Sequence, residues 1–560
     1  MRFTIILAGL ATAACSASNA SFGGGGGGGG GINASDAGAS NSCLSSSECP
    51  TGYTCNEFGQ CIAPPAPVGD AGTPPPPEVE YDFGAPISSD RFVYVAMTAQ
   101  DELARIDGRT LAVISTHVGK SPRDVATIPH SDGAVVLDST NGTATVVRPS
   151  GSTDVIRVLP TLQHLNRLDI DPSGRFAVIW FDLAKAIKEG GINGVGSFQD
   201  VTVVALAEGH ERAVDLTVGF RPRNVQFDAA GNRAYVVTQD GVSVIDLAYA
   251  TMHGPSIVPP IPVADPAIPA DTLEVDIVST GEYAAVSEAG SSALRIVSVG
   301  ATNPGQAWQI PLASAASDID LAPDGARVYV VERTAKKLAI IDVPGDGINP
   351  AGVQTIDLAD ATLGSLALSH DGTRAVLYTN ATLDERLTLV KLDLPGFPHV
   401  TWPLKKGVRA VGISPTSDSA IVLHAKAFGD PAAATSVDDF IDKSYGYSLV
   451  DLASGFAKLQ ITPVDPGAFT YASDGAKAYV SLDGGDGLTA PRALQIVNTH
   501  TGVVTTKQLG SPPSAVGILP GIAQAFVAQR HTLGRVSFVD LLDDSVRTVT
   551  GFDLNGHVVN

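Results

Sequence analysis

A hairpin-like segment recurs from about residue 90 to the end of the chain, and this repeat constrains the fold more than any other feature. The clearest copy runs from Ile319 to Val331 as an apolar stretch, a Pro-Asp-Gly turn and a second stretch rich in β-branched and aromatic residues. Two short apolar runs around a Gly-containing turn are typical of a β-hairpin. The repeat therefore predicts many short, antiparallel strands.

The spacing of the copies predicts the architecture. Adjacent copies are 43 to 58 residues apart, close to the 40 to 50 residues of one four-stranded propeller blade. The nine copies open at Val125, Leu168, Val225, Val275, Ile319, Leu366, Val411, Phe469 and Val516. A partial copy at Phe92 to Asp107 lacks an opening strand, which Gly556 to Asn560 are expected to supply, closing the ring. We therefore expect an all-β fold, a β-propeller of about ten blades over residues 90–560; eight or nine blades, or two packed propellers, also fit the spacing.

Two features of the repeat are interpreted as structural. Seven copies place Gly at the turn, at positions where a positive φ is expected: Gly133, Gly174, Gly231, Gly281, Gly325, Gly372 and Gly475. Several third strands end in an apolar-Asp pair, and these carboxylates are expected to cap the next turn: Asp107, Asp246, Asp342, Asp451 and Asp540.

The segments Arg327 to Val331 (RVYVV) and Gly119 to Val125 (GKSPRDV) resemble the YVTN family of β-propeller repeats. The resemblance covers about Asp90 to Asn560 and implies a propeller. Proteins with this repeat include surface and periplasmic binding proteins, and related propellers include lactonases. The resemblance therefore implies a fold and leaves the activity open.

The N-terminus predicts export. Residues 1–15 combine Arg2, a short apolar run and small residues, as in a secretory signal. The end of this run resembles a bacterial lipobox, which implies lipidation of Cys15; an ordinary cleaved signal is the alternative. Ser16 replaces the Asp that signals inner-membrane retention in that family, so the resemblance implies an outer-membrane lipoprotein, facing the periplasm or the cell surface.

Three segments separate this signal from the repeats. Residues 16–42 include nine consecutive glycines and are expected to form a flexible tether. Residues 43–61 resemble short two-disulfide modules of the EB or EGF-like kind, with Cys43, Cys49, Cys55 and Cys61 as the candidate half-cystines. A four-thiolate zinc site is the alternative, and three disulfide pairings are open. Residues 62–89 are a Pro-rich linker.

Composition limits the partners. The formal net charge of −22 repels nucleic acid and anionic membranes and favours a soluble monomer, so a membrane is expected to be contacted only through the lipid. The sequence has no nucleophile elbow, HExxH, P-loop or dinucleotide fingerprint. No catalytic residue and no cofactor are predicted. Calcium at Asp483 to Gly487 has no EF-hand spacing to support it, and metal ligands from different blades cannot be recognised in a sequence.

Basic residues gather where the chain enters inner strands. The candidates for a weak anion-binding rim are Lys120, Arg123, Arg167, Arg221, Arg223 and Arg409, with His164, Lys405 and Lys406 beside them. A planar guanidinium suits carboxylate and phosphate groups. The alternative is that these side chains pair with acidic neighbours such as Asp124 and Glu274.

These observations favour a cell-envelope lipoprotein whose propeller binds a protein, a peptide or a glycan. The first alternative is a hydrolase of the lactonase type with a metal at the channel mouth, for which Glu274 and Asn224 are the residues to inspect. The second is a structural component of a surface layer.

Overall fold

The computed structural model describes residues 87–98, 100–122, 124–188, 197–359, 361, 363–484, 491–531 and 533–551, and the backbone of residues 54–55 and 61–62. The chain divides into two compact units, of which one spans Ser21–Pro76. In that unit, β1 (Thr54–Cys55) pairs antiparallel with β2 (Cys61–Ile62). The predicted signal, lipidation site and tether, and the side chains of the predicted disulfides, lie outside the described residues.

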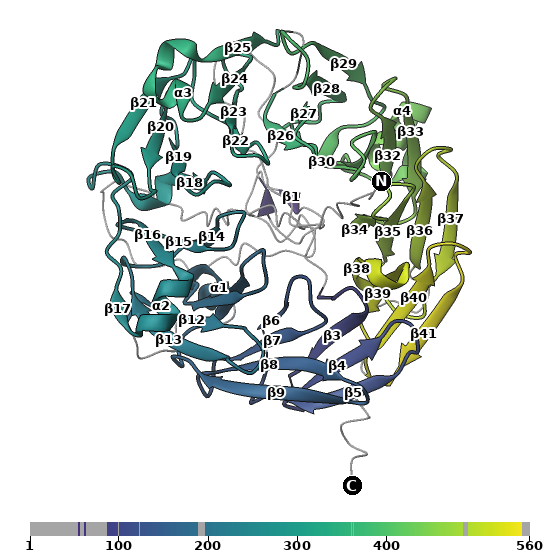
Figure 1. Cartoon of the computed structure of the whole chain (residues 1–560). Helices are drawn as coiled ribbons and strands as arrows, with labels where there is room; N and C mark the ends of the chain where they lie inside the picture. Colours follow the sequence, from purple (N-terminus) through teal and green to yellow (C-terminus); the bar gives the residue numbers. More distant parts are fainter. Residues whose placement is uncertain are drawn as a thin grey trace, which may run out of the picture. The chain divides into compact units, whose positions relative to one another are not determined.

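The second compact unit contains ten antiparallel sheets arranged in a ring, so the fold is a ten-bladed β-propeller (Figure 1). This confirms the all-β prediction and its higher blade count. The chain passes from blade 1 in purple to blade 10 in yellow, and these two blades are neighbours.

Blade 1 contains β3 (Phe92–Met97), β4 (Glu102–Asp107) and β5 (Val113–His117). Blade 2 contains β6 (Asp124–Thr127), β7 (Ala134–Asp138), β8 (Thr143–Ser150) and β9 (Thr153–Pro160). Blade 3 contains β10 (Arg167–Ile170), β11 (Phe176–Trp180), β12 (Asp200–Ala205), β13 (Arg212–Thr217) and β17 (Ser256–Ile257). Blade 4 contains β14 (Asn224–Phe227), β15 (Arg233–Thr238) and β16 (Gly241–Asp246).

Blade 5 contains β18 (Leu273–Ile277), β19 (Tyr283–Glu288), β20 (Ala293–Ser298) and β21 (Ala307–Pro311). Blade 6 contains β22 (Asp318–Leu321), β23 (Arg327–Glu332), β24 (Lys337–Asp342) and β25 (Gln354–Asp357). Blade 7 contains β26 (Ser365–Leu368), β27 (Arg374–Tyr378), β28 (Arg386–Lys391) and β29 (His399–Pro403).

Blade 8 contains β30 (Val408–Ile413), β31 (Ser419–His424), β32 (Tyr445–Asp451) and β33 (Ala457–Thr462). Blade 9 contains β34 (Pro466–Tyr471), β35 (Lys477–Asp483), β36 (Arg492–Asn498) and β37 (Val504–Gln508). Blade 10 contains β38 (Pro513–Leu519), β39 (Gln524–Gln529), β40 (Arg535–Asp540) and β41 (Val546–Thr550).

Short helices occupy the connections: α1 (Leu183–Lys188), α2 (Leu247–His253), η2 (Ala270–Thr272), α3 (Gly345–Ile348), η3 (Pro350–Gly352), η4 (Pro431–Ala433), α4 (Val437–Lys443) and η5 (Pro520–Ile522). None of the helices in the described part of the chain is long and apolar enough to cross a bilayer.

Two blades depart from the expected four strands. In blade 4, residues 247–272 fold as α2, β17 and η2, and β17 pairs with β13 of blade 3 in a parallel register. A single bridge from Val242 to Ile261 replaces the fourth strand of blade 4. In blade 1, β3 is the innermost strand described, and the segment expected to supply an inner strand, residues 556–560, lies outside the described residues.

The turn after the first strand requires a left-handed residue. Six of the seven predicted glycines have φ between 63° and 74°, and the structure places Ser417 (φ 59°) and Ala523 (φ 51°) at the equivalent turns of blades 8 and 10. Gly133 is the exception, because the longer turn of blade 2 has its positive φ at His130. The repeat therefore demands this backbone conformation even where glycine is missing.

The Asp residues that end third strands cap turns in four of the five predicted cases. Asp107 Oδ1 accepts from the Arg109 N–H at 2.8 Å, and Asp451 Oδ1 accepts from the Ser454 N–H at 2.6 Å. The Asp246 and Asp540 carboxylates act in the same way. Asp342 differs, because its carboxylate pairs with Arg327 Nε at 2.9 Å.

Apolar side chains between adjacent blades form the core, and the same packing closes the ring. Val93 and Ile106 of blade 1 share one buried cluster with Phe526 and Phe538 of blade 10. Hydrogen bonds span the same junction: the Gly521 N–H donates to the Asp90 carbonyl at 3.0 Å, and Arg547 donates to the carbonyls of Gly108 and Arg109, each at 3.0 Å. Blades 1 and 10 are therefore joined directly by described residues.

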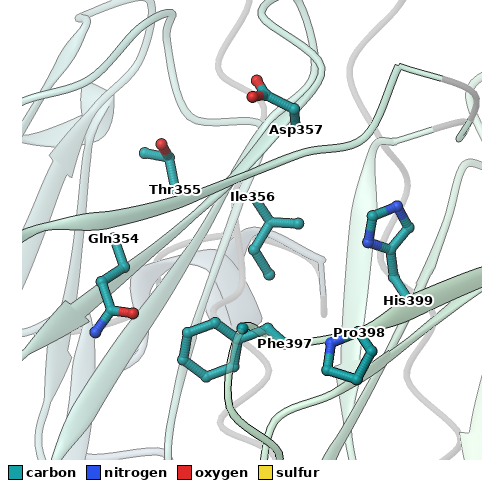
Figure 2. Close-up of a pocket in the computed structure, with 8 residues that line it drawn as sticks. Gln354, Thr355, Ile356, Asp357, Phe397, Pro398 and His399 are labelled. Carbon is teal, nitrogen blue, oxygen red and sulfur yellow. The ribbon is translucent and has the colours of Figure 1, made fainter.

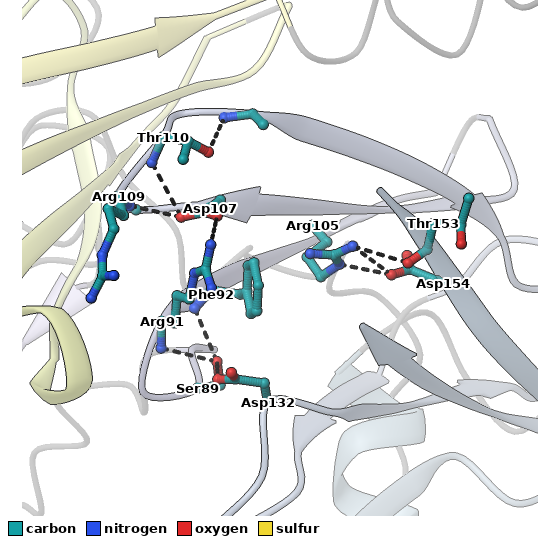
Figure 3. A network of polar contacts seen from close by, with 12 residues as sticks. Ser89, Arg91, Phe92, Arg105, Asp107, Arg109, Thr110, Asp132, Thr153 and Asp154 are labelled. Carbon is teal, nitrogen blue, oxygen red and sulfur yellow. Dashed lines mark hydrogen bonds and ion pairs between the residues drawn. The ribbon is translucent and has the colours of Figure 1, made fainter. Parts of the chain in front are cut away.

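A buried ion pair joins blade 1 to blade 2 (Figure 3). The Arg105 guanidinium lies 2.8 Å from Asp154, and the two side chains are only 3% and 1% exposed. Thr116 Oγ1 donates to the same carboxylate at 2.6 Å, and the guanidinium carbon lies 4.4 Å from the centroid of the Phe92 ring. Both charges are therefore satisfied inside the protein.

The antiparallel order of the strands sorts the connections onto two faces. The loops between second and third strands lie on the same face as the links from one blade to the next, and we call it the link face. The insertion that contains α1 and the insertion that contains η4 and α4 both join a second strand to a third strand. Both insertions are therefore on the link face, and both contain helix.

Candidate functional site

The basic link residues lie on the link face, in two sectors of the ring. Lys120, Arg167, Arg221 and Arg223 lead into the neighbouring blades 2, 3 and 4, whereas Arg409 belongs to blade 8. The Lys120 and Arg221 side chains are exposed, and the Arg221 guanidinium lies 5.0 Å from the centroid of the Phe220 ring. Arg123 lies outside the described residues.

The other three arginines contact protein groups. Arg167 Nη1 lies 3.1 Å from Asp182 Oδ2; burial opposes its charge, but the Asp169 and Asp182 carboxylates raise the pKa of the guanidinium. Arg223 donates to the Ala270 carbonyl, and burial lowers its pKa.

Arg409 connects blades 8 and 9. Its Nη1 lies 2.7 Å from Asp465 Oδ2, and its Nη2 donates to the Pro466 carbonyl at 2.9 Å. Its side chain is 11% exposed. An anion at this position would have to compete with Asp465, so anion binding by the basic rim stays a prediction, centred on the exposed Lys120 and Arg221.

Polar side chains of the inner strands also serve the architecture. Asp124 of β6 accepts from the Leu168 N–H at 2.9 Å, and Asp318 of β22 accepts from the Leu366 N–H at 2.7 Å. Gln226 of β14 donates to the Val275 carbonyl of β18 at 2.9 Å and accepts from the Ile277 N–H at 2.7 Å. The inner edge of a sheet exposes unpaired backbone groups, and these side chains satisfy them from the preceding blade.

Burial raises the pKa of two inner-strand carboxyl groups, those of Asp169 and Asp320. Burial raises the pKa of Asp320 to about 7, and the Glu274 carboxylate adds to the shift, although the backbone N–H groups of Leu321 and Leu368 lower it. Glu274 accepts from Ser287 Oγ at 3.4 Å. Asp320 and Glu274 lie on the inner strands of adjacent blades, and the Glu274 charge opposes ionisation of Asp320.

The described residues contain no group of three His, Cys, Asp or Glu side chains close enough to bind a metal ion. Glu274 and Asn224, the first residues to inspect for a hydrolase, lie on the neighbouring inner strands β18 and β14. In the acidic turn considered for calcium, residues 485–490 are outside the described part, and Asp483 pairs with Arg530 Nη2 at 2.7 Å.

A groove of about 540 Å³ lies at the outer rim, between β25 of blade 6 and residues 396–399 of blade 7 (Figure 2). Its wall includes Ile356, Asp357, Phe397 and His399. Asp357 already pairs with Lys337 Nζ at 3.0 Å, and Phe397 is 8% exposed. Gln354, Thr355 and His399 also line the groove and are exposed, so its polar groups belong to separate strands of two blades.

Lys406, predicted beside the basic rim, is instead buried in a polar cluster of blade 8 that the sequence did not indicate. Lys406 is 1% exposed and its Nζ donates to the Asp442 carbonyl at 2.7 Å. His424 is also 1% exposed, and burial, reinforced by the nearby Lys406 and Arg409 charges, lowers its pKa to about 4. Its ring contacts the Gly407 carbonyl and Ser448 Oγ. The sequence shows only that Lys406 comes shortly before β30 and that His424 comes directly before the insertion.

No family model matches the chain, and no curated protein sequence matches it. Among solved structures, a eukaryotic initiation factor is similar over 75% of this chain and 96% of its own, with 11% identity and a TM-score of 0.46. The dihydro-heme d1 dehydrogenase NirN is similar over 74% and 72%, with 12% identity and a TM-score of 0.37. A β-propeller domain from Myceliophteria thermophila is similar over 62% and 97%, with 12% identity and a TM-score of 0.33. Similarity at this level concerns the fold alone.

Proposed function

We propose that this chain is an exported lipoprotein of the outer membrane, anchored through Cys15, whose propeller is a binding scaffold for a protein, a peptide or a glycan. The observation that carries the proposal is the combination of a closed ring of ten blades with helix-containing insertions on its link face. Stacked blades give a rigid platform, and loops on such a platform supply the specificity.

The arrangement of charged groups supports a scaffold over a hydrolase. Asp124 and Asp318 bind backbone N–H groups of the next blade, and Arg167 and Arg409 bind carboxylates. A lactonase-type mechanism needs a metal held by several oxygen ligands at the channel mouth. Asp124, Asp169 and Asp182 lie near one another, but Arg167 pairs with two of them. The described residues contain no group of three His, Cys, Asp or Glu side chains placed to hold a metal ion.

The test compares binding with turnover on the same preparation. The purified full chain is used to select binders from a random peptide library and on a glycan array, while its metal content and its hydrolysis of lactones and esters are measured in parallel. The proposal predicts reproducible binders without turnover. Turnover that depends on a stoichiometric metal would establish the hydrolase alternative instead, and ordered self-assembly without a ligand would favour the surface-layer alternative.

A further inference from the structure

Large apolar side chains are exposed on two neighbouring loops of the link face at blades 7 and 8. Leu383, between β27 and β28, is 63% exposed. In the insertion between β31 and β32, Phe428 is 79%, Val437 75% and Phe440 43% exposed. Apolar side chains that are exposed together mark contact sites for other molecules. We call these four residues, with Glu385 and Asp438 beside them, the blade 7–8 surface.

The two loops are held together by the link between the blades. Leu383 packs on Gly407, where an added Cβ would lie 3.2 Å from the Leu383 Cα. From the adjacent position, Lys406 Nζ donates to the Asp442 carbonyl of α4 at 2.7 Å. The Ala427 N–H donates to the same carbonyl at 2.8 Å. The link at Gly407 and Lys406 therefore contacts both loops and holds them next to each other.

Local hydrogen bonds order the insertion (Figure 1 shows α4 beside blade 8). Ser436 caps α4, because its Oγ accepts from the Asp439 N–H at 3.0 Å. Asp439 Oδ2 accepts in return from the Thr435 N–H at 2.8 Å, and Asp439 also pairs with Lys443. An ordered surface loses little conformational entropy when it binds, which favours affinity.

Carboxylates neighbour the apolar side chains in the sequence, because Glu385 follows Leu383 by two residues and Asp438 follows Val437 directly. Glu385 and Asp438 are exposed. Burial and the neighbouring Asp442, Asp384 and Asp438 carboxylates raise the pKa of Glu385, although the nearby Lys406 charge lowers it. A partner with positive charge relieves this repulsion, whereas an anionic bilayer or a second copy of the same surface increases it.

We propose that the blade 7–8 surface binds a segment of a partner protein in which apolar side chains alternate with Lys or Arg. This inference rests on the proposed scaffold function and makes it specific. The apolar side chains would contact Leu383, Phe428 and Val437, and the basic groups would face Glu385 and Asp438.

The test uses the full chain and a synthetic 14-residue peptide of Leu and Lys, measured by fluorescence anisotropy. The double variant Phe428→Ser/Val437→Ser is expected to weaken binding at least about tenfold, because two apolar contacts are removed. Glu385→Gln/Asp438→Asn is expected to weaken binding about threefold and to reduce its dependence on salt.

Matched controls carry the same change at equally exposed positions. Phe456 is 70% exposed on the opposite face of blade 8, and Ile257 is 77% exposed in β17. Phe456→Ser/Ile257→Ser is expected to leave the affinity unchanged. The same peptide with Glu in place of Lys is expected to bind at least about tenfold more weakly, because like charges then face each other.

Several results would overturn the inference. The first is that the wild type and the Phe428→Ser/Val437→Ser variant bind the peptide with equal affinity, while library selection still yields binders. The scaffold function would then stand, and the blade 7–8 surface would not be the binding site. Phosphatidylglycerol vesicles binding more tightly than the peptide would identify a lipid surface. Concentration-dependent dimers that Phe428→Ser abolishes would identify a second copy. Failure of all peptides and glycans would instead reject the scaffold function itself.

Discussion

Replacing Arg105 by Met tests the buried connection between blades 1 and 2. The substitution leaves Asp154, 1% exposed, with Thr116 as its remaining side-chain partner among those described. An uncompensated buried charge costs about 3–5 kcal/mol, so the variant is expected to lose that much stability. Removing both charges, in Arg105→Met/Asp154→Leu, is expected to cost less than either single change, because two desolvated charges disappear together.

The assay is a double-mutant cycle on the full chain. A protein of this size unfolds through intermediates, so hydrogen exchange of β4 and of the β8–β9 hairpin is measured beside chemical unfolding. Arg233→Met is the control, because its partner Glu282 is 45% exposed and such a pair contributes at most about 1 kcal/mol. Single variants whose costs simply add in the double variant would refute the reasoning.

Three further predictions concern other parts of the chain. The folded state holds the Asp320 proton up to about pH 7, so the free energy of unfolding should fall as the pH rises from about 4 to 7. Asp320→Asn should remove that loss, which is on the order of 4 kcal/mol at most. Unfolding curves at both ends of this pH range measure it. Ala523→Gly should raise the melting temperature, because it relieves up to about 1 kcal/mol of strain in a left-handed residue. Gly325→Ala should lower the melting temperature, because the new Cβ would lie 2.5 Å from Ser279 Oγ. Cys15→Ser should release the protein from membrane fractions; a variant that stays membrane-bound would contradict lipid anchoring.

Much of the fold could be predicted from the sequence because the repeat period is the length of one blade. The opening apolar residues Ile319 and Val516 are 9% and 3% exposed, as their register requires. The lack of a fourth strand in blade 4 could not be predicted, because residues 247–272 have no repeat signal of their own. The pairing of β17 with β13 of blade 3 depends on long-range packing.

The candidate site was less predictable than the fold. The sequence singled out Arg409 as a basic link residue, but its partner Asp465 lies 56 residues away in the next blade. Phe428 and Val437 belong to a capped insertion in the structure, and their exposure could not be predicted, because burial depends on which loops surround them. Long-range contacts therefore decide which polar groups are paired within the protein and which apolar side chains stay exposed to a partner.

Hydrogen exchange of the full chain with and without the Leu and Lys peptide tests the central claim most directly. The account predicts slower exchange in residues 379–386 and 425–444, the two loops of the blade 7–8 surface, and unchanged exchange elsewhere. Protection confined to the outer groove of β25 and residues 396–399, or to inner strands such as β18 and β22, would contradict it.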